Sequence, residues 1–204
     1  MDLTEQEQFW SGKFGDEYIE RNKNTKLTPN NISLFSKVFS NTEDISSIIE
    51  LGSNIGYNLI ALNSLFPDAE LSAVEINASA ASILKQWGKV KVFNQSILNF
   101  NPDYQRDLVI TKGVLIHIAP ESLQLVYETM HKCSKKYIFV AEYYSPTPQE
   151  ITYRGHTNKL FKRDFAGELL DKYKDLELIN YGFVYHRDAS FPQDDLTWFL
   201  LRKQ

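Results

Sequence analysis

Residues 48–59 read IIELGSNIGYNL, and this stretch decides the fold. An apolar run ends at Gly52, and an amphipathic run begins after Gly56. Glycine lets the backbone adopt positive φ angles and approach a ligand closely. A helix that starts here offers free N–H groups and the positive end of its dipole. The stretch therefore predicts a strand, then a turn that faces a ligand, then a helix.

Short apolar strands and helices alternate after this unit. The expected strands are residues 46–52, 71–76, 90–95, 107–113 and 136–144, and the expected helices are residues 56–66, 78–87 and 120–133. Such alternation is typical of βαβ units and of a mostly parallel sheet with helices on both faces.

The C-terminal part changes this rhythm. A helix over residues 161–173 is followed by two strands, 176–186 and 196–203, with only a short polar loop between them. Strands joined in this way pair antiparallel. We therefore expect an α/β, Rossmann-like fold, in which a seven-stranded sheet is mostly parallel and ends in an antiparallel C-terminal hairpin.

The chain is expected to be one compact unit, with a helical cap over residues 1–44 and the sheet domain over residues 45–204. Trp10, Phe14 and Tyr18 fall on one helical stripe, which two glycines can interrupt. Such a stripe either packs against the core or covers a ligand. The cap is predicted to contain one or two helices over residues 2–21, a polar turn-rich segment over 22–31 and an amphipathic helix over 31–40.

The composition and charge of the chain disfavour some classes of function. The chain has 204 residues, 43% hydrophobic and 24% charged, which fits one globular domain. A net charge of −4 disfavours a nucleic-acid binder, which usually has a basic face. Cys133 is the single cysteine, so a reducing compartment is expected. With no visible signal peptide and no apolar run of ~18 residues, we expect a cytoplasmic protein that does not bind membranes.

A second feature indicates an adenosine cofactor. Glu75 ends the second expected strand, 19 residues after Gly56, where an acid can accept hydrogen bonds from both ribose hydroxyls. A dinucleotide site needs G-x-G-x-x-G, and Asn54 lies where a further glycine would be required. Glu50, at the end of the first strand, suits a cationic ligand better than a pyrophosphate.

Residues 50–56, ELGSNIG, resemble the first motif of class I S-adenosylmethionine-dependent methyltransferases, with Asn54 in place of the middle glycine. Glu75 resembles the ribose-binding acid of that family, residues 95–97 its adenine-side segment, and residues 107–118 its fourth-strand segment. The resemblance implies that S-adenosyl-L-methionine is the cofactor. It assigns cofactor binding to Glu50, Gly52, Asn54, Gly56, Glu75, Ile76, Ser96, Ile97 and Gly113.

Two other segments carry a closer resemblance. Residues 8–22, QFWSGKFGDEYIERN, and residues 162–167, KRDFAG, are similar to methyltransferases associated with pseudaminic acid biosynthesis. That bacterial family is tied to nonulosonic acids, the sialic-acid-like sugars of surface glycans and flagella. The resemblance implies a small, acidic, sugar-type acceptor or its nucleotide form, and it leaves the methylated atom open.

The residues expected to bind the acceptor lie at the same edge of the sheet, at the carboxyl ends of the parallel strands. His117 lies just past the fourth strand, where its ordinary pKa near 6.5 suits a general base, although this segment often carries a histidine that only lines the pocket or has a structural role. Residues 143–165 form either a lid over this edge or a solvated loop. Within them, the guanidinium of Arg154 suits a carboxylate or phosphate. The expected acceptor-binding residues are Trp10, Tyr18, Tyr143, Tyr144 and Arg154.

Two competing interpretations stay open at this point. A nicotinamide-dependent oxidoreductase is disfavoured by the missing G-x-G-x-x-G and by the single-domain length. A non-catalytic cofactor-binding protein would keep the same glycines and acids, so only the site can decide. The sequence shows no metal-ligand spacing, no nucleophile elbow and no P-loop. It predicts a small-molecule substrate and does not determine the oligomeric state.

Overall fold

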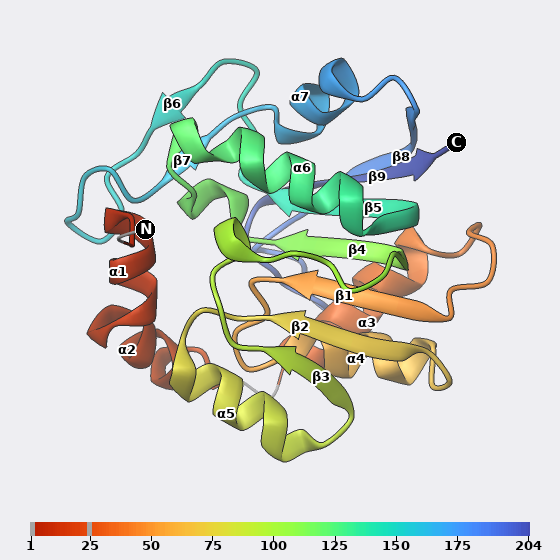
Figure 1. The fold of residues 1–204 in the computed structure, drawn as a ribbon, viewed down its shortest axis with the longest axis horizontal. Coiled ribbons are helices and arrows are strands. Elements are labelled where there is room, and N and C mark those ends of the chain that lie inside the picture. Colours follow the sequence, from red (N-terminus) through yellow and green to blue (C-terminus); the bar gives the residue numbers. More distant parts are fainter. Residues whose placement is uncertain (1–2, 24–25) are drawn as a thin grey trace.

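The fold is a seven-stranded sheet between two layers of helices (Figure 1). The computed structural model describes residues 3–23 and 26–204. In spatial order the sheet contains β3 (Val90–Phe93), β2 (Glu70–Val74), β1 (Ser47–Leu51), β4 (Arg106–Lys112), β5 (Ser134–Glu142), β9 (Leu196–Lys203) and β8 (Leu176–Val184). Neighbours from β3 to β5 run parallel, whereas β9 runs antiparallel to β5 and β8. The expected Rossmann-like α/β fold with its antiparallel hairpin is confirmed.

Both faces of the sheet are covered, which explains why its central strands are almost continuously apolar. On one face, Phe35 and Leu62 lie in a core with strand residues of β1 and β4. On the other, Met130 and Leu169 do the same. The covering helices are α3 (Leu27–Val38), α4 (Tyr57–Leu65) and α5 (Ala78–Trp87) on the first face, and α6 (Leu123–Cys133) and α7 (Phe165–Lys172) on the second.

The N-terminal segment forms two short helices beside the carboxyl ends of the parallel strands (Figure 1). The chain turns at Gly12, where an added Cβ would lie 2.9 Å from a backbone oxygen of the first helix. The indole of Trp10 still meets the rings of Phe14 and Tyr18 edge-on, at centroid distances of 5.4 and 5.2 Å. The predicted aromatic stripe therefore forms across the break between α1 (Glu5–Ser11) and α2 (Lys13–Arg21).

Helix α3 begins earlier than the sequence pattern predicts. A turn-rich segment over residues 22–31 and a helix over 31–40 were expected, but residues 27–30 already belong to α3, so the prediction was wrong there. Pro29 lies in the first helical turn, where its missing N–H removes no intrahelical hydrogen bond. Residues 24 and 25 lie outside the described residues.

The segment before α7 also differs from the prediction. The expected helix over residues 161–173 is shorter, because Phe161–Lys162 forms β7 and pairs antiparallel with β6 (Gln149–Glu150). The Asp164 side chain accepts a hydrogen bond from the N–H of Gly167 at 2.8 Å and so caps α7. In the part of the chain described here, no helix is both long and apolar enough to cross a membrane. The division into a cap over residues 1–44 and a domain over 45–204 stays a prediction.

Candidate active site

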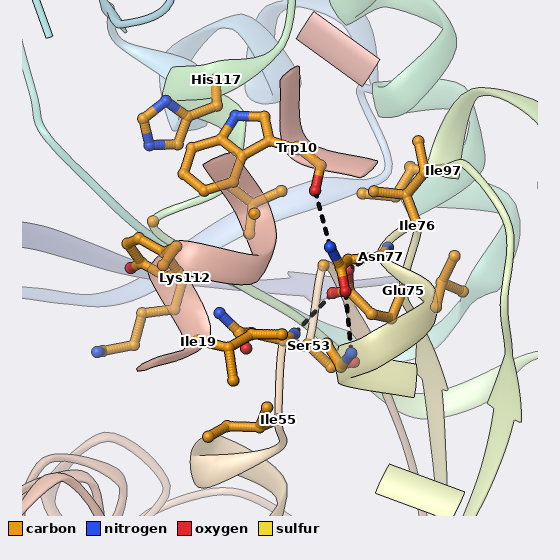
Figure 2. A pocket seen from close by; sticks show the side chains of 18 of the residues that line it. Trp10, Ile19, Ser53, Ile55, Glu75, Ile76, Asn77, Ile97, Lys112 and His117 are labelled. Atoms are coloured by element: carbon orange, nitrogen blue, oxygen red, sulfur yellow. Dashed lines mark hydrogen bonds between the residues drawn. The ribbon is translucent and has the colours of Figure 1, made fainter. Parts of the chain in front are cut away.

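A cavity of about 240 Å³ opens beyond the carboxyl ends of β1, β2 and β4, and residues of α1 and α2 line it as well (Figure 2). Strand β1 lies between β2 and β4, so strand order reverses here, which is where open α/β sheets bind ligands. The predicted site residues that line this cavity are Trp10, Tyr18, Gly52, Asn54, Gly56, Glu75, Ile76, Ser96, Ile97, Gly113 and His117.

The turn between β1 and α4 has the backbone that its glycines predict. Gly52 and Gly56 have φ angles of 79° and 87°, and an added Cβ would lie 2.7 Å from the Val114 side chain and 2.4 Å from that of Leu84, respectively. Asn54 takes a φ of 45°. Asparagine tolerates this left-handed conformation better than most residues, which explains how it replaces the middle glycine of the motif.

Glu75 is held in place by the backbone around it. Its two carboxylate oxygens accept the N–H groups of Asn54 and Asn77, each at 2.7 Å. Burial raises the pKa of Glu75, and these two N–H groups oppose the rise. Asn77 also caps α5, and its amide donates to the Trp10 carbonyl at 3.3 Å (Figure 2). The carboxylate is thus fixed at the cavity wall and linked to the N-terminal helices above it.

Several polar atoms at this cavity are buried and have no hydrogen-bond partner in the part of the chain that the structure describes. Leaving such an atom unpaired costs about 1–3 kcal/mol, so the cavity suits a polar ligand that supplies both donors and acceptors. Among the described residues, these cavity-lining atoms are Glu7 Oε1, Trp10 Nε1, Asn31 Oδ1, Ser53 Oγ and Asn54 Oδ1. In the same part of the chain no group of three or more histidines, cysteines and acids is arranged to hold a metal.

His117 faces the cavity as a neutral imidazole. Its Nδ1 lies 2.6 Å from the carbonyl oxygen of Lys159. A carbonyl only accepts, so Nδ1 carries the proton and Nε2 keeps its lone pair. Burial between the rings of Trp10 and Tyr153, at centroid distances of 4.6 and 5.0 Å, lowers the pKa of His117 to about 4. The ring therefore stays uncharged at neutral pH.

Glu142 was not singled out from the sequence, yet it positions His117. This buried carboxylate accepts the N–H groups of Val114 and Leu115, each at 3.0 Å, and so fixes the short 3₁₀ helix Leu115–His117. Burial raises the pKa of Glu142 to about 7. An acid that directly follows the apolar run of residues 137–141 is a visible signal in the sequence, but the segment that it binds is known only from the fold.

Glu50 is placed differently from what the resemblance implies. It is fully buried beneath the glycine turn and does not line the cavity. Its Oε1 accepts a hydrogen bond from the Asn58 amide at 2.6 Å, and burial raises its pKa to about 8. In this arrangement Glu50 therefore does not contact a ligand in the cavity directly.

Three predicted acceptor residues also lie off the cavity lining. Tyr144 is 42% exposed and packs near Phe199, at a centroid distance of 6.1 Å. Arg154 is exposed, with a φ of 50°. Tyr143 is partly buried, which raises its pKa to about 12. Polar lining residues that sequence reasoning missed include Asn31, Ser53, Lys112 and Asp194.

Solved structures resemble this chain over nearly its whole length, although protein-family models and curated proteins gave no match. An S-adenosylmethionine-dependent methyltransferase from Leishmania major has a TM-score of 0.71 at 13% identity, covering 99% of this chain and 87% of that one. Burkholderia thailandensis 1,6-didemethyltoxoflavin-N1-methyltransferase has a TM-score of 0.69 at 12% identity, covering 98% and 87%. The N-methyltransferase NodS from Bradyrhizobium japonicum has 0.66 at 15%, covering 92% and 97%.

These likenesses define the class of fold. The chain has the Rossmann-like fold of S-adenosylmethionine-dependent methyltransferases, and the Burkholderia and Bradyrhizobium structures contain bound S-adenosylhomocysteine. Identities of 12–15% extend this conclusion to the fold alone. These structures do not show a relation to the pseudaminic acid methyltransferases.

Proposed function

We propose that this protein is an S-adenosyl-L-methionine-dependent methyltransferase. The observation that carries the proposal is the position of the Glu75 carboxylate at the wall of the same cavity as the glycine turn. The cavity fits an adenosine cofactor, because buried Ser53 Oγ and Asn54 Oδ1 have no hydrogen-bond partner among residues 3–23 and 26–204. Glu75 would bind the ribose hydroxyls, and Ile76 and Ile97 would contact the adenine.

The reaction needs little covalent help from the protein. When bound, S-adenosylmethionine supplies a methyl group that is already activated on a sulfonium. The chain must therefore bind and orient the acceptor and exclude water. The N-terminal helices suit this task, because Trp10 and Tyr18 line the cavity from above. Segment 8–22, which carries the closer resemblance, thus supplies acceptor-side residues.

His117 is the proposed catalytic residue. Its Nε2 lone pair can accept a hydrogen bond from an acceptor hydroxyl and receive the proton as the oxygen is methylated. Because the pKa of His117 is lowered to about 4, the acid limb of the rate profile should lie near pH 4 and not near 6.5. His117→Gln should lower kcat about a hundredfold. A limb near 6.5 that disappears in this variant would show that His117 titrates with its ordinary pKa.

The proposed acceptor is a small, acidic sugar-type molecule such as a nonulosonic acid or its derivative. The fold itself does not determine the acceptor, since similar structures include a 1,6-didemethyltoxoflavin methyltransferase and a plantazolicin methyltransferase. Support comes from the resemblance of residues 8–22 and 162–167 and from the unpaired polar atoms that line the cavity.

The deciding experiment is calorimetric titration with S-adenosylmethionine, S-adenosylhomocysteine and NAD in parallel. We expect both sulfur compounds to bind and NAD not to bind. Nonulosonic acids and their nucleotide forms would then be screened for methylation in the presence of S-adenosylmethionine. Binding of NAD alone would favour an oxidoreductase, and cofactor binding without turnover of any acceptor would favour a non-catalytic binding protein.

A further inference from the structure

Lys112 is a cation inside the cavity that the proposed mechanism does not use. It is the last residue of β4, is partly buried, and lines the cavity. Among residues 3–23 and 26–204, no hydrogen bond or ion pair involves its side chain. Burial lowers the pKa of Lys112, while Asp194, Glu50 and Glu142 favour its charged form.

The lysine points away from the proposed cofactor side. In Figure 2 its side chain extends to the opposite side of the cavity from Glu75, Ile76 and Ile97. An anion bound to Lys112 would therefore lie on the acceptor side of the site. The position follows from β4, which ends at Lys112 just before the turn that leads to His117.

Two further polar side chains line the same cavity. Asn31 of α3 lines the cavity with only 2% of its surface exposed, and its Oδ1 has no partner among the described residues. Asp194, from the loop between β8 and β9, lines the same cavity and remains exposed. Both are acceptors for hydroxyl, amide or amine groups. The site thus combines one cation with groups that bind donors.

The loop that carries Asp194 is fastened to α3. The Asn30 side chain donates to the carbonyl of Pro192 at 2.5 Å, and the Gln193 side chain donates to the carbonyl of Asn30 at 2.9 Å. Asn30 and Gln193 are themselves buried. The two acceptor side chains that line the cavity therefore keep a defined separation, as a binding site for a small molecule requires.

We propose that Lys112 binds an oxyanion of the acceptor, a carboxylate or a phosphate, while hydroxyl or amide groups of the same molecule donate to Asn31 and Asp194. This inference rests on the proposed function and names the residue that selects an acidic acceptor. Arg154, which the sequence suggested for this role, is exposed and lies off the cavity lining. A partly buried ammonium without a partner attracts an anion more strongly than an exposed guanidinium does.

The test uses N-acetylneuraminic acid, its methyl ester and inorganic phosphate as probes. The full-length protein, saturated with S-adenosylhomocysteine, is titrated with each probe by calorimetry. We expect N-acetylneuraminic acid or phosphate to bind and the uncharged ester to bind at least about tenfold more weakly. Lys112→Met should lose the same factor for the anions, whereas Lys89→Met, which removes an exposed lysine on the surface, should not.

Separate outcomes overturn the proposal. Neither anion binding to the wild type, or equal binding to wild type and Lys112→Met, would remove Lys112 from acceptor recognition. If Lys112→Met weakens S-adenosylhomocysteine but not 5′-methylthioadenosine, which lacks the carboxylate, Lys112 binds the cofactor instead. If Lys112→Met does not fold, Lys112→Gln replaces it. Absence of S-adenosylhomocysteine binding to the wild type would refute the proposed function, and anion titration of the protein alone would still decide the role of Lys112.

Discussion

The two walls of the cavity are built by different interactions. The floor, residues 50–58 and 75–77, is held by backbone geometry and by hydrogen bonds to carboxylates, such as those from Asn54 and Asn77 to Glu75. The roof, residues 5–21, is held mainly by contacts between rings, including contacts with Tyr153 and His156, which do not line the cavity. Trp10 of the roof meets His117 and Tyr153 with centroid distances of 4.6 and 6.4 Å.

This difference suggests different roles for the two walls: the floor recognises the ligand, and the roof encloses it. Directional hydrogen bonds fix the floor groups that would recognise a cofactor, whereas ring contacts are less directional and mainly exclude water. Polar links between the walls include the bonds from the Asn77 amide to Asp16 at 3.0 Å and to the Trp10 carbonyl at 3.3 Å. Substitutions in the floor should therefore affect binding more than substitutions in the roof.

The largest effect is expected at Glu75. Glu75→Ala should weaken S-adenosylhomocysteine binding about a hundredfold, because the hydrogen bonds to a charged acceptor and the support of the turn are both lost. Calorimetry measures the change. Glu70→Ala, at the exposed beginning of the same strand, is the matched control. A loss of less than about threefold in Glu75→Ala would contradict the role of the floor.

Glu50 should control how stability depends on pH. Its folded-state pKa of about 8 lies above the ordinary 4.5, so the folded protein retains a proton that the unfolded chain releases. The associated stability is present below pH 4.5 and is lost as pH rises toward 8. Relative to Glu50→Gln, the wild type should lose on the order of 4 kcal/mol over this window.

Urea unfolding between pH 4.5 and 8 measures that difference. Glu121→Gln, which changes an exposed acid in the turn before α6, should follow the wild type throughout. Parallel pH profiles of wild type and Glu50→Gln would mean that Glu50 ionises in the folded state as it does in water.

Trp10 should give a smaller effect in the roof. Trp10→Ala removes the ring that packs on His117, Phe14 and Tyr18, so S-adenosylhomocysteine binding should weaken about tenfold as water enters the cavity. Tyr181→Ala, which truncates a 67% exposed ring on β8, should bind as the wild type does. If Trp10→Ala weakens S-adenosylhomocysteine binding as much as Glu75→Ala does, the floor and the roof contribute equally to the binding free energy.

The smallest effect is expected at the ion pair between Glu5 and Lys159. The Lys159 side chain is only 5% exposed, but the Glu5 side chain is 64% exposed, so water screens this ion pair and it should contribute little. Glu5→Ala should change S-adenosylhomocysteine binding less than twofold, as should Glu20→Ala, which breaks the exposed pair with Lys23. A tenfold loss confined to Glu5→Ala would identify this ion pair as what holds the roof closed.

The sequence by itself determined the class of fold and most of the floor. Alternating strands and helices, the spacing of Gly52 and Gly56, and Glu75 at a strand end are local features, because backbone conformation and strand direction depend on neighbouring residues. Their positions in the structure agree with the predictions. The start of α3 was missed, since a proline in a first helical turn looks like a turn signal in sequence.

Only the tertiary structure decided which distant residues share the cavity. Glu142 reaches the turn before His117 because β4 and β5 are neighbours, and Asp194 reaches the cavity because β9 inserts between β5 and β8. Lys112 and Arg154 also differ in burial: Lys112 is partly buried and lines the cavity, whereas Arg154 is exposed and does not line it. Sequence patterns report local geometry, whereas burial and contacts across the sheet depend on strand order, which no local pattern encodes.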